Sequence, residues 1–174
     1  LTRLVDQDGH AAPNNCGGTL AAYVSISLAI SAANPGDTII VCPSTAPYNE
    51  QLTIDKELTL RGFPLTNVVI RPAPALANTT SLYNGTPIAA VIVVTDTTAT
   101  LTNLVVDGSA AAISGSDCSV PNLIGIFYRN ASGTVSDTTV RNIALEPGLE
   151  GCQAGLGIFA QSGDGGQSDL TVDG

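Results

Sequence analysis

Two aspartates, Asp137 and Asp169, come closest in type and spacing to a site for chemistry. They occupy one column when three similar stretches of the chain are written above one another, and the third member of that column is Asn103. Stacked strands lie about 4.8 Å apart, so neighbouring residues of a column would be within contact distance. Two carboxylates placed in this way could hold a calcium ion or serve as acid and base. The commoner alternative is a pair of solvated side chains beside a turn.

A second column holds Asp107, Arg141 and Asp173, in which the sign of the charge alternates. This pattern indicates an ion ladder on the surface. Exposed ion pairs contribute roughly 0–1 kcal/mol each, so we expect the ladder to be structural.

The Pro- and Asn-rich segment Arg71–Pro87 is a third candidate, because long loops on a rigid scaffold are common binding sites. It carries Tyr83, the aromatic residue best placed to stack on a sugar, and beside it Asn84, which begins an N-x-Thr sequon. Tyr83 and Asn84 therefore define a candidate ligand loop. Whether the sequons are glycosylated stays open.

The columns come from three gap-free copies, Val91–Gly108, Gly125–Asn142 and Gly157–Gly174, offset by 34 and then 32 residues. A period of this size is typical of solenoids, propellers and arrays, in which each unit buries its apolar face against its neighbours. The apolar runs are short, β-branched and rich in Thr, and Gly, Asn and Asp separate them, which favours strands and turns.

The four cysteines fit the same register. Cys118 and Cys152 are 34 residues apart, so they occupy equivalent points of successive coils, at a distance that suits a disulfide. Cys16 is then left to pair with Cys42. Zinc is the alternative, but the chain has no Cys-x-x-Cys and one histidine. Two disulfides predict an oxidising location, secreted or at the cell surface.

The elements that precede the repeat can also be predicted. One helix is expected over roughly Ser25–Ala33, where Ser25 can act as the N-cap and Asn34-Pro35-Gly36 ends the helix. A short amphipathic helix at this place would cover the open apolar end of a solenoid. The strands expected around the helix and outside the repeat are Leu1–Val5, Thr38–Cys42, Gln51–Ile54, Leu58–Leu60 and Asn67–Ile70.

The run SISLAISAANPGDTIIVCPSTAPYNEQLTIDKELTLRGF resembles the N-terminal portion of secreted right-handed parallel β-helix proteins of the pectate-lyase-like superfamily. The matching elements are the helix, the Pro-Gly-Asp-Thr-Ile strand in Asn34–Val41, the Tyr-x-Glu turn at Tyr48–Glu50 and the coil Leu52–Gly62. Ser27 departs from the Gln common in that helix, and Ser44-Thr45-Ala46-Pro47 replaces a compact Gly-Thr turn.

The resemblance implies an all-β fold: a right-handed parallel β-helix, or solenoid, with a short N-terminal capping α-helix. We expect a single domain over residues 1–174. Residues 1–36 would form the N-terminal strand, loop and capping helix, and residues 37–174 the coils, with loop insertions near 71–87, 109–123 and 143–156. The family includes lyases, esterases, epimerases and adhesins, so the fold alone does not select an activity.

The catalytic patterns of such relatives are not recognisable here. A lyase-type site needs calcium carboxylates and a basic residue on one face, whereas Arg129 shares its column with Thr95 and Gln161. We find no esterase motif either, so no catalytic residue and no cofactor is assigned, with calcium at Asp137 and Asp169 as the exception to test.

Composition excludes two classes of partner. The net charge is −9 with only six basic residues, which argues against nucleic acid and, overall, against polyanionic glycans. No apolar run approaches the 18 residues of a membrane span. The start at Leu1 fits a processed or trimmed chain.

The chain stops directly after the strand Leu170–Val172 and lacks a terminal cap. Bare strand edges invite pairing, so either further coils or another subunit would cover this end. From the sequence we therefore expect an extracellular, non-catalytic structural or surface-recognition module that associates end to end into filaments. The alternatives are a polysaccharide-active lyase, esterase or epimerase with its site beyond residue 174 or unrecognised, and a calcium-dependent glycan-binding domain.

Overall fold

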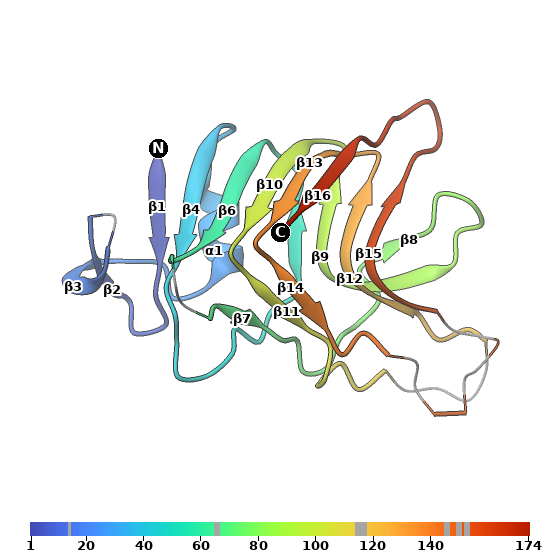
Figure 1. Cartoon of the computed structure of the whole chain (residues 1–174), viewed down its shortest axis with the longest axis horizontal. Helices are drawn as coiled ribbons and strands as arrows, with labels where there is room; N and C mark the ends of the chain where they lie inside the picture. Colours follow the sequence, from blue (N-terminus) through green and yellow to red (C-terminus); the bar gives the residue numbers. More distant parts are fainter. Residues whose placement is uncertain (14, 65–66, 114–117, 145–146, 149–150, 152–153) are drawn as a thin grey trace.

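The computed structural model is a parallel β-helix in which the chain winds through three sheets (Figure 1). It describes every residue except 14, 65–66, 114–117, 145–146, 149–150 and 152–153. The six-stranded sheet has the order β1 (Thr2–Val5), β4 (Asp37–Val41), β6 (Leu58–Gly62), β10 (Thr98–Thr102), β13 (Ser132–Ser136) and β16 (Leu170–Asp173). The three-stranded sheet contains β14 (Thr139–Arg141), β11 (Val105–Asp107) and β7 (Val69–Ile70). The five-stranded sheet contains β15 (Gly155–Gln161), β12 (Asn122–Arg129), β9 (Pro87–Thr95) and β5 (Leu52–Ile54), and the short β8 (Thr79–Thr80) pairs with β9.

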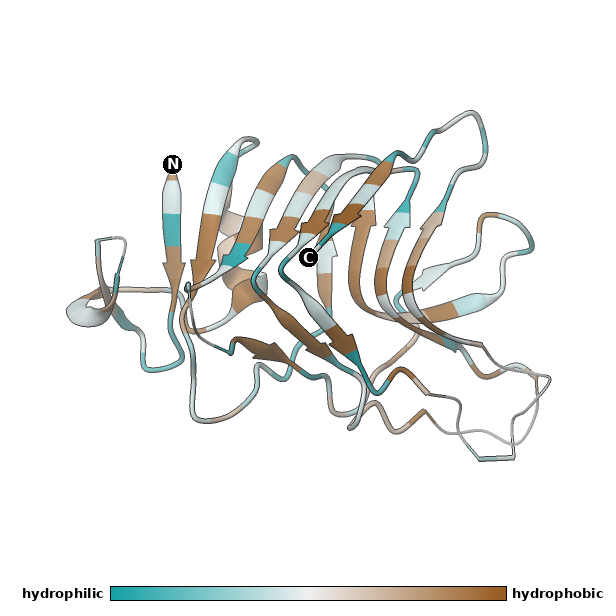
Figure 2. Cartoon of the chain, viewed as in Figure 1, coloured by the Kyte–Doolittle hydropathy of each residue, from teal (hydrophilic) through white to brown (hydrophobic). Residues whose placement is uncertain are grey.

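Alternation along each strand builds the core. In the six-stranded sheet the inward row contains Ile39, Leu60, Leu101 and Val135, all between 0 and 1% exposed. Pale or teal bands alternate with brown bands along these strands, as expected when one face packs inward and the other meets solvent (Figure 2). β9 and β12 are buried along almost their whole length, because their outer face is covered as well.

The capping helix α1 (Ile26–Ala32) lies where the sequence predicts it. The Ser25 side chain accepts a hydrogen bond from the Leu28 amide, and the Glu50 carboxylate accepts bonds from the amides of Ile26 and Ser27. Ile26, Ala29 and Ile30 are buried in the main core. The helix therefore covers the N-terminal end of the core and is fixed there by a residue of the next coil.

The segment between the first strand and the helix, which we expected to be a loop, instead contains an antiparallel hairpin of β2 (His10–Ala12) and β3 (Asn15–Ala21). The disulfide between Cys16 and Cys42, predicted from the sequence, is present and joins this hairpin to the residue after β4. Hairpins with a Gly- and Asn-rich sequence lack the apolar alternation that marks a buried strand, so the pattern did not reveal this one.

The first two sequence copies are stacked as predicted, with Ile92 beside Ile126 and Leu101 beside Val135. The third copy is in register only in its first half, where Ile126 pairs with Ile158. Its second half is displaced. Gly133 pairs with Leu170, an offset of 37 residues instead of 32, because the turn between β15 and β16 contains extra residues. The gap-free alignment was therefore wrong beyond β15.

The segment before β9 covers the outer face of the five-stranded sheet. Under it lies a second apolar cluster of Ile88, Ala90, Val93, Ile124 and Phe127, with Phe159 packed against it. The rings of Phe127 and Phe159 are stacked with their centroids 5.4 Å apart. β9 and β12 are apolar on both faces because one face packs into the main core and the other into this cluster.

Candidate functional site

The structure does not bring Asp137 and Asp169 together. Asp169 precedes β16, and its amide donates to the hydroxyl of Ser132, at the start of β13. Asp137 follows the other end of β13, and its amide donates to the Asp173 carbonyl. The two aspartates are thus separated by the length of a five-residue strand, about 16 Å. They do not form the carboxylate pair that the alignment suggested.

The column shared by Asn103 and Asp137 is a turn position. Both residues have a left-handed backbone, with φ of 56° and 46°, where the chain passes from the six-stranded to the three-stranded sheet. The side-chain NH₂ group of Asn103 donates to the carbonyl oxygens of Gly62 and Phe63 in the preceding coil. Gly62 has no alternative here, since a Cβ would overlap the Asn103 carbonyl oxygen. This turn position therefore has a structural role, because the Asn103 side chain holds its own coil against the preceding one.

Of the predicted ion ladder, the structure contains the pair Asp107–Arg141, and its carboxylate is buried. Arg141 lies beside Asp107 and donates to its carboxylate from Nε and Nη2, both at 3.0 Å. Asp107 is only 2% exposed, and it also accepts bonds from the Asn142 side chain and the Ser109 amide. Asp173 is not a member, since it pairs with Ser136 in another sheet.

The environment of Asp107 changes its acidity. Burial alone would raise the pKa of this carboxyl, but the hydrogen bonds from Asn142, Ser109 and Arg141 outweigh it and lower the pKa to about 2. The Asp107 carboxyl is therefore ionised near neutral pH and has no proton to exchange. Its hydrogen bonds to Asn142, Ser109 and Arg141 fit a structural role.

Tyr83 and Asn84 lie at the tip of the hairpin that joins β8 to β9. Tyr83 is 90% exposed, and the Asn84 side chain accepts a bond from the Thr86 amide, which shapes the turn. The hairpin is anchored on the sheet by Gln161, whose side-chain oxygen accepts from the Leu82 amide at 2.7 Å. Tyr83 is thus an accessible aromatic on a fixed loop, with no second aromatic beside it among the described ring contacts.

The outer face of the five-stranded sheet is where side chains from successive coils could converge. Its rows hold Val93, Phe127 and Phe159, which are apolar, and then Thr95, Arg129 and Gln161. Arg129 Nε donates to the Thr80 carbonyl, so the row is used to hold the covering segment. Neither row includes a carboxylate, and these described coils offer no acid and base pair on this face.

A polar groove of about 400 Å³ lies between α1 and β5. Several of its groups are already engaged: Lys56 Nζ donates to the carbonyls of Ile30 and Ala33, and the Ser27 hydroxyl donates to Glu50. Ser31, Gln51, Thr53 and Asp55 complete the polar lining. The groove is therefore the seam that joins the cap to the first coil.

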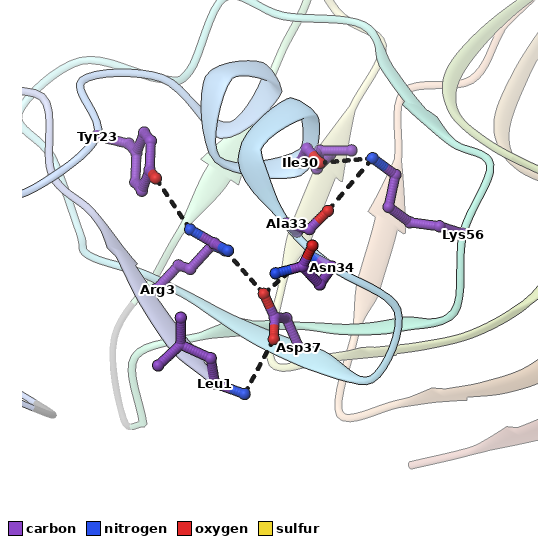
Figure 3. Close-up of polar contacts among 8 residues, drawn as sticks. All are labelled: Leu1, Arg3, Tyr23, Ile30, Ala33, Asn34, Asp37 and Lys56. Carbon is purple, nitrogen blue, oxygen red and sulfur yellow. Dashed lines mark hydrogen bonds and ion pairs between the residues drawn. The ribbon is translucent and has the colours of Figure 1, made fainter.

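Figure 3 shows a cluster of charged and polar groups around the buried Asp37, at the same end of the molecule. Asp37 accepts from Arg3 Nε and the Asn34 amide, each at 2.9 Å, and its other oxygen lies 2.9 Å from the amino group of Leu1. The Asn34 amide, the Leu1 amino group and Arg3 lower the pKa of Asp37 to about 2. Arg3 also donates to the Tyr23 hydroxyl. The contacts of Leu1 and Arg3 with Asp37 attach β1 to β4.

Two further predictions can be placed only in part. Cys118 is disulfide-bonded, but its expected partner Cys152 lies outside the described residues. Within the part of the chain that is described, no cluster of three or more His, Cys, Asp or Glu side chains is arranged to hold a metal ion. No helix there is both long and apolar enough to cross a membrane.

Glu50 is the residue that reasoning from the sequence missed. Besides capping α1, it follows Tyr48, whose buried hydroxyl donates to the Cys42 carbonyl. The Tyr-x-Glu turn is thus a structural device that connects the cap, the disulfide and the first coil. The turn motif itself was visible in the sequence, but the partners of its side chains were not.

Comparison with known proteins places the chain among solved β-helices. No protein-family model matches, and no curated protein matches. A crystal structure of pectin methylesterase in complex with hexasaccharide VII superposes with a TM-score of 0.55 at 17% identity, over 90% of this chain and 45% of that one. A D178A mutant of pectin methylesterase in complex with hexasaccharide IV gives 0.53 at 18%, over 98% and 48%.

The chain thus spans about half the length of these solved structures. At such identities the likeness establishes the fold. The protein is a right-handed parallel β-helix with a single short helix among its described residues, as the N-terminal motif predicts.

Proposed function

We propose that this β-helix belongs to a polysaccharide-active protein and that its described coils bind the glycan. The observation that carries the proposal is the architecture, which two pectin methylesterases in hexasaccharide complexes share over at least 90% of this chain. A β-helix presents the same strand position once per coil, and such a rigid repeating surface suits a ligand that is itself a repeating chain. The comparison thus favours the polysaccharide-active alternative over a purely structural module.

Binding, not bond breaking, is the part assigned to these coils. On the outer face of the five-stranded sheet, Val93 and Phe127 are buried beneath the covering segment, and Phe159 packs against them, so this row offers no reacting group. Hydrolysis of an ester or a glycosidic bond needs a positioned acid, base or nucleophile. The most strongly perturbed carboxyls, Asp37 and Asp107, are both engaged in structural ion pairs.

The net charge of the protein limits the class of glycan that it can bind. A net charge of −9 repels a polyuronate, whereas a neutral or methyl-esterified polysaccharide experiences no such repulsion. The Cys16–Cys42 disulfide supports a secreted or cell-surface location, where such polymers are found, because disulfides persist in oxidising compartments.

Calorimetry with methyl-esterified and de-esterified hexagalacturonate, together with cellohexaose, tests this proposal. We expect binding of at least one uncharged hexasaccharide and weaker binding of the de-esterified one. A methanol-release assay on the esterified probe should remain at the blank rate. Methanol release would assign catalysis to these coils, and failure of all three probes to bind would overturn the proposal.

A second candidate is self-association through the last coil, the role that the sequence favoured. In β16, Val172 continues the buried row of Val135 but is 58% exposed, and Leu156 of β15 is 37% exposed. Light scattering over a concentration series, with Val172→Asp for comparison, tests it. Growth of the wild-type particles that the variant abolishes would support end-to-end contact, and a concentration-independent monomer would exclude it.

A further inference from the structure

One threonine stands in the same register position on every strand of the six-stranded sheet. The strands pair residue by residue, so these six side chains form one row parallel to the helix axis. The members of this threonine row are Thr2, Thr38, Thr59, Thr100, Thr134 and Thr171. No segment of the chain crosses in front of this sheet in Figure 1.

The row faces solvent. The residues beside it in sequence, such as Leu60, Leu101 and Val135, are buried, so the threonines point to the opposite face. Within the described structure, none of the six hydroxyls has a hydrogen-bond partner in the protein. The adjacent row differs, since the Ser136 hydroxyl donates to Thr102 Oγ1 at 3.1 Å.

Strand propensity alone does not account for the row. Val, Ile and Tyr suit a strand as well as Thr does, and outward positions next to this row vary accordingly. The neighbouring row passes through Ile40, Arg61, Thr102, Ser136 and Asp173. Repetition of one residue in one row, with its polar atoms unused by the fold, points to a ligand with a matching repeat.

A hollow accompanies the row. It encloses about 110 Å³ between Gly36, Glu57, Thr59, Thr98 and Thr100, and Gly36 leaves it open because nothing lies within 4 Å of where its Cβ would be. The Glu57 carboxylate at its rim can accept hydrogen bonds from two hydroxyls of one sugar.

The charges around the row are mainly negative. Glu57, Asp169 and Asp173 flank it, against the Arg61 guanidinium and the amino group of Leu1, which is paired with Asp37. A polyuronate would meet repulsion here, whereas an uncharged glycan would meet hydrogen-bonding groups only.

We propose that the threonine row binds an uncharged linear polysaccharide lying parallel to the helix axis, which rests on the proposed function. Adjacent threonines are separated by the strand spacing of about 4.8 Å, close to the length of one hexose in an extended chain. The row spans about 24 Å and so faces about five sugar residues. Each sugar would form a hydrogen bond with one threonine hydroxyl, and the Glu57 carboxylate would bind the sugar that occupies the hollow.

The test is the triple variant Thr59→Val, Thr100→Val and Thr134→Val. Valine keeps the β-branched shape and replaces the hydroxyl with a methyl group. The matched control carries valine at Thr79, Thr80 and Thr139, whose hydroxyls also lack partners among the described residues and lie outside the row. Both are compared with the wild type by calorimetry, using cellohexaose and methyl-esterified hexagalacturonate.

We expect the row variant to bind the hexasaccharide at least about 10-fold more weakly, while the control retains wild-type affinity. Circular dichroism verifies the folds, and the single variant Thr100→Val replaces the triple if the triple does not fold. Equal affinity of the row variant and the wild type would overturn this inference and leave the proposed function standing. Absence of binding by the wild type would overturn both.

Ice is the other periodic partner that a regular hydroxyl row could meet, and a thermal-hysteresis measurement separates the two. Hysteresis that the row variant loses, without glycan binding by the wild type, would assign the row to ice and overturn the inference. Wild-type solutions without hysteresis, combined with the 10-fold loss of glycan affinity, would support it.

Discussion

Asp107 shows how much a single buried carboxylate contributes at the scale of the residue. It fastens β11 to β14 through Arg141 and also accepts bonds from Asn142 and the Ser109 amide. Removal of one charge from a buried ion pair lowers stability by more than the pair's net contribution. The remaining polar groups then stay desolvated without a partner.

We therefore expect Asp107→Asn to lower the free energy of unfolding by about 2 kcal/mol. Asp173→Asn is the matched control, since that residue makes no described ion pair, and it should change stability by less than about 0.5 kcal/mol. Urea titrations of the two variants and the wild type measure the difference. Equal stability of the two variants would contradict the structural role of Asp107.

The same carboxylate gives the protein a dependence on pH. Its pKa falls from 3.8 to about 2 on folding, so the unfolded chain takes up the proton first as the solution is acidified. The stabilisation is complete above about pH 5 and is lost as the pH falls through 3.8 towards 2. Unfolding curves between pH 2 and 6 should show the gap between wild type and Asp107→Asn closing at the acidic end. A constant gap would mean that the pKa of Asp107 is not lowered.

The residues that reasoning from the sequence misplaced share one physical cause. Asp169 and Asp173 follow the turn between β15 and β16, whose extra residues shift the register. The offset of 32 residues happens to match Asp137 with Asp169 and Val140 with Val172, so the wrong alignment still pairs identical residue types. Only the pairing of the backbones distinguishes the true columns.

At the scale of the element, the capping helix depends on a residue outside it. α1 is seven residues long, and helices this short are marginal without tertiary support. Glu50 supplies that support by accepting bonds from the amides of Ile26 and Ser27, each at 2.8 Å.

Glu50→Gln should lower the free energy of unfolding by about 1–2 kcal/mol and increase hydrogen exchange at the first turn of α1. Gln retains one oxygen, so part of the cap remains. Asp55→Asn, an exposed acid in the same coil, serves as the control and should leave exchange unchanged. A uniform effect on exchange over the whole chain would argue against a local cap.

The elements themselves were largely predictable, because strong local signals coincide with them. Ser25 and Asn34-Pro35-Gly36 bound the helix, and β-branched runs mark β4, β5 and β6. The hairpin β2–β3 was not predicted, because its strands contain Gly and Asn and only Ala11 is fully buried there. Long-range pairing decides such segments, and no short window of sequence contains it.

At the scale of the whole molecule, net charge should govern which glycans bind. With −9 at neutral pH, the affinity for de-esterified hexagalacturonate should be weaker than for the esterified form and should rise with salt as the repulsion is screened. Calorimetry at low and high ionic strength measures both. Affinity for the acidic probe that falls with salt would instead reveal a local basic site.

The Cys16–Cys42 disulfide also decides how the molecule would respond to a mechanical load. The bond joins residues at a sequence separation of 26 and closes a loop that contains α1 and β4. A pulling force applied between the two ends would pass through the sulfur atoms and leave that loop without tension. Reduction would release roughly 90 Å of additional contour length, at about 3.5 Å per residue. Under tension between its two ends, the molecule would therefore keep α1 and β4 free of load while the bond is intact.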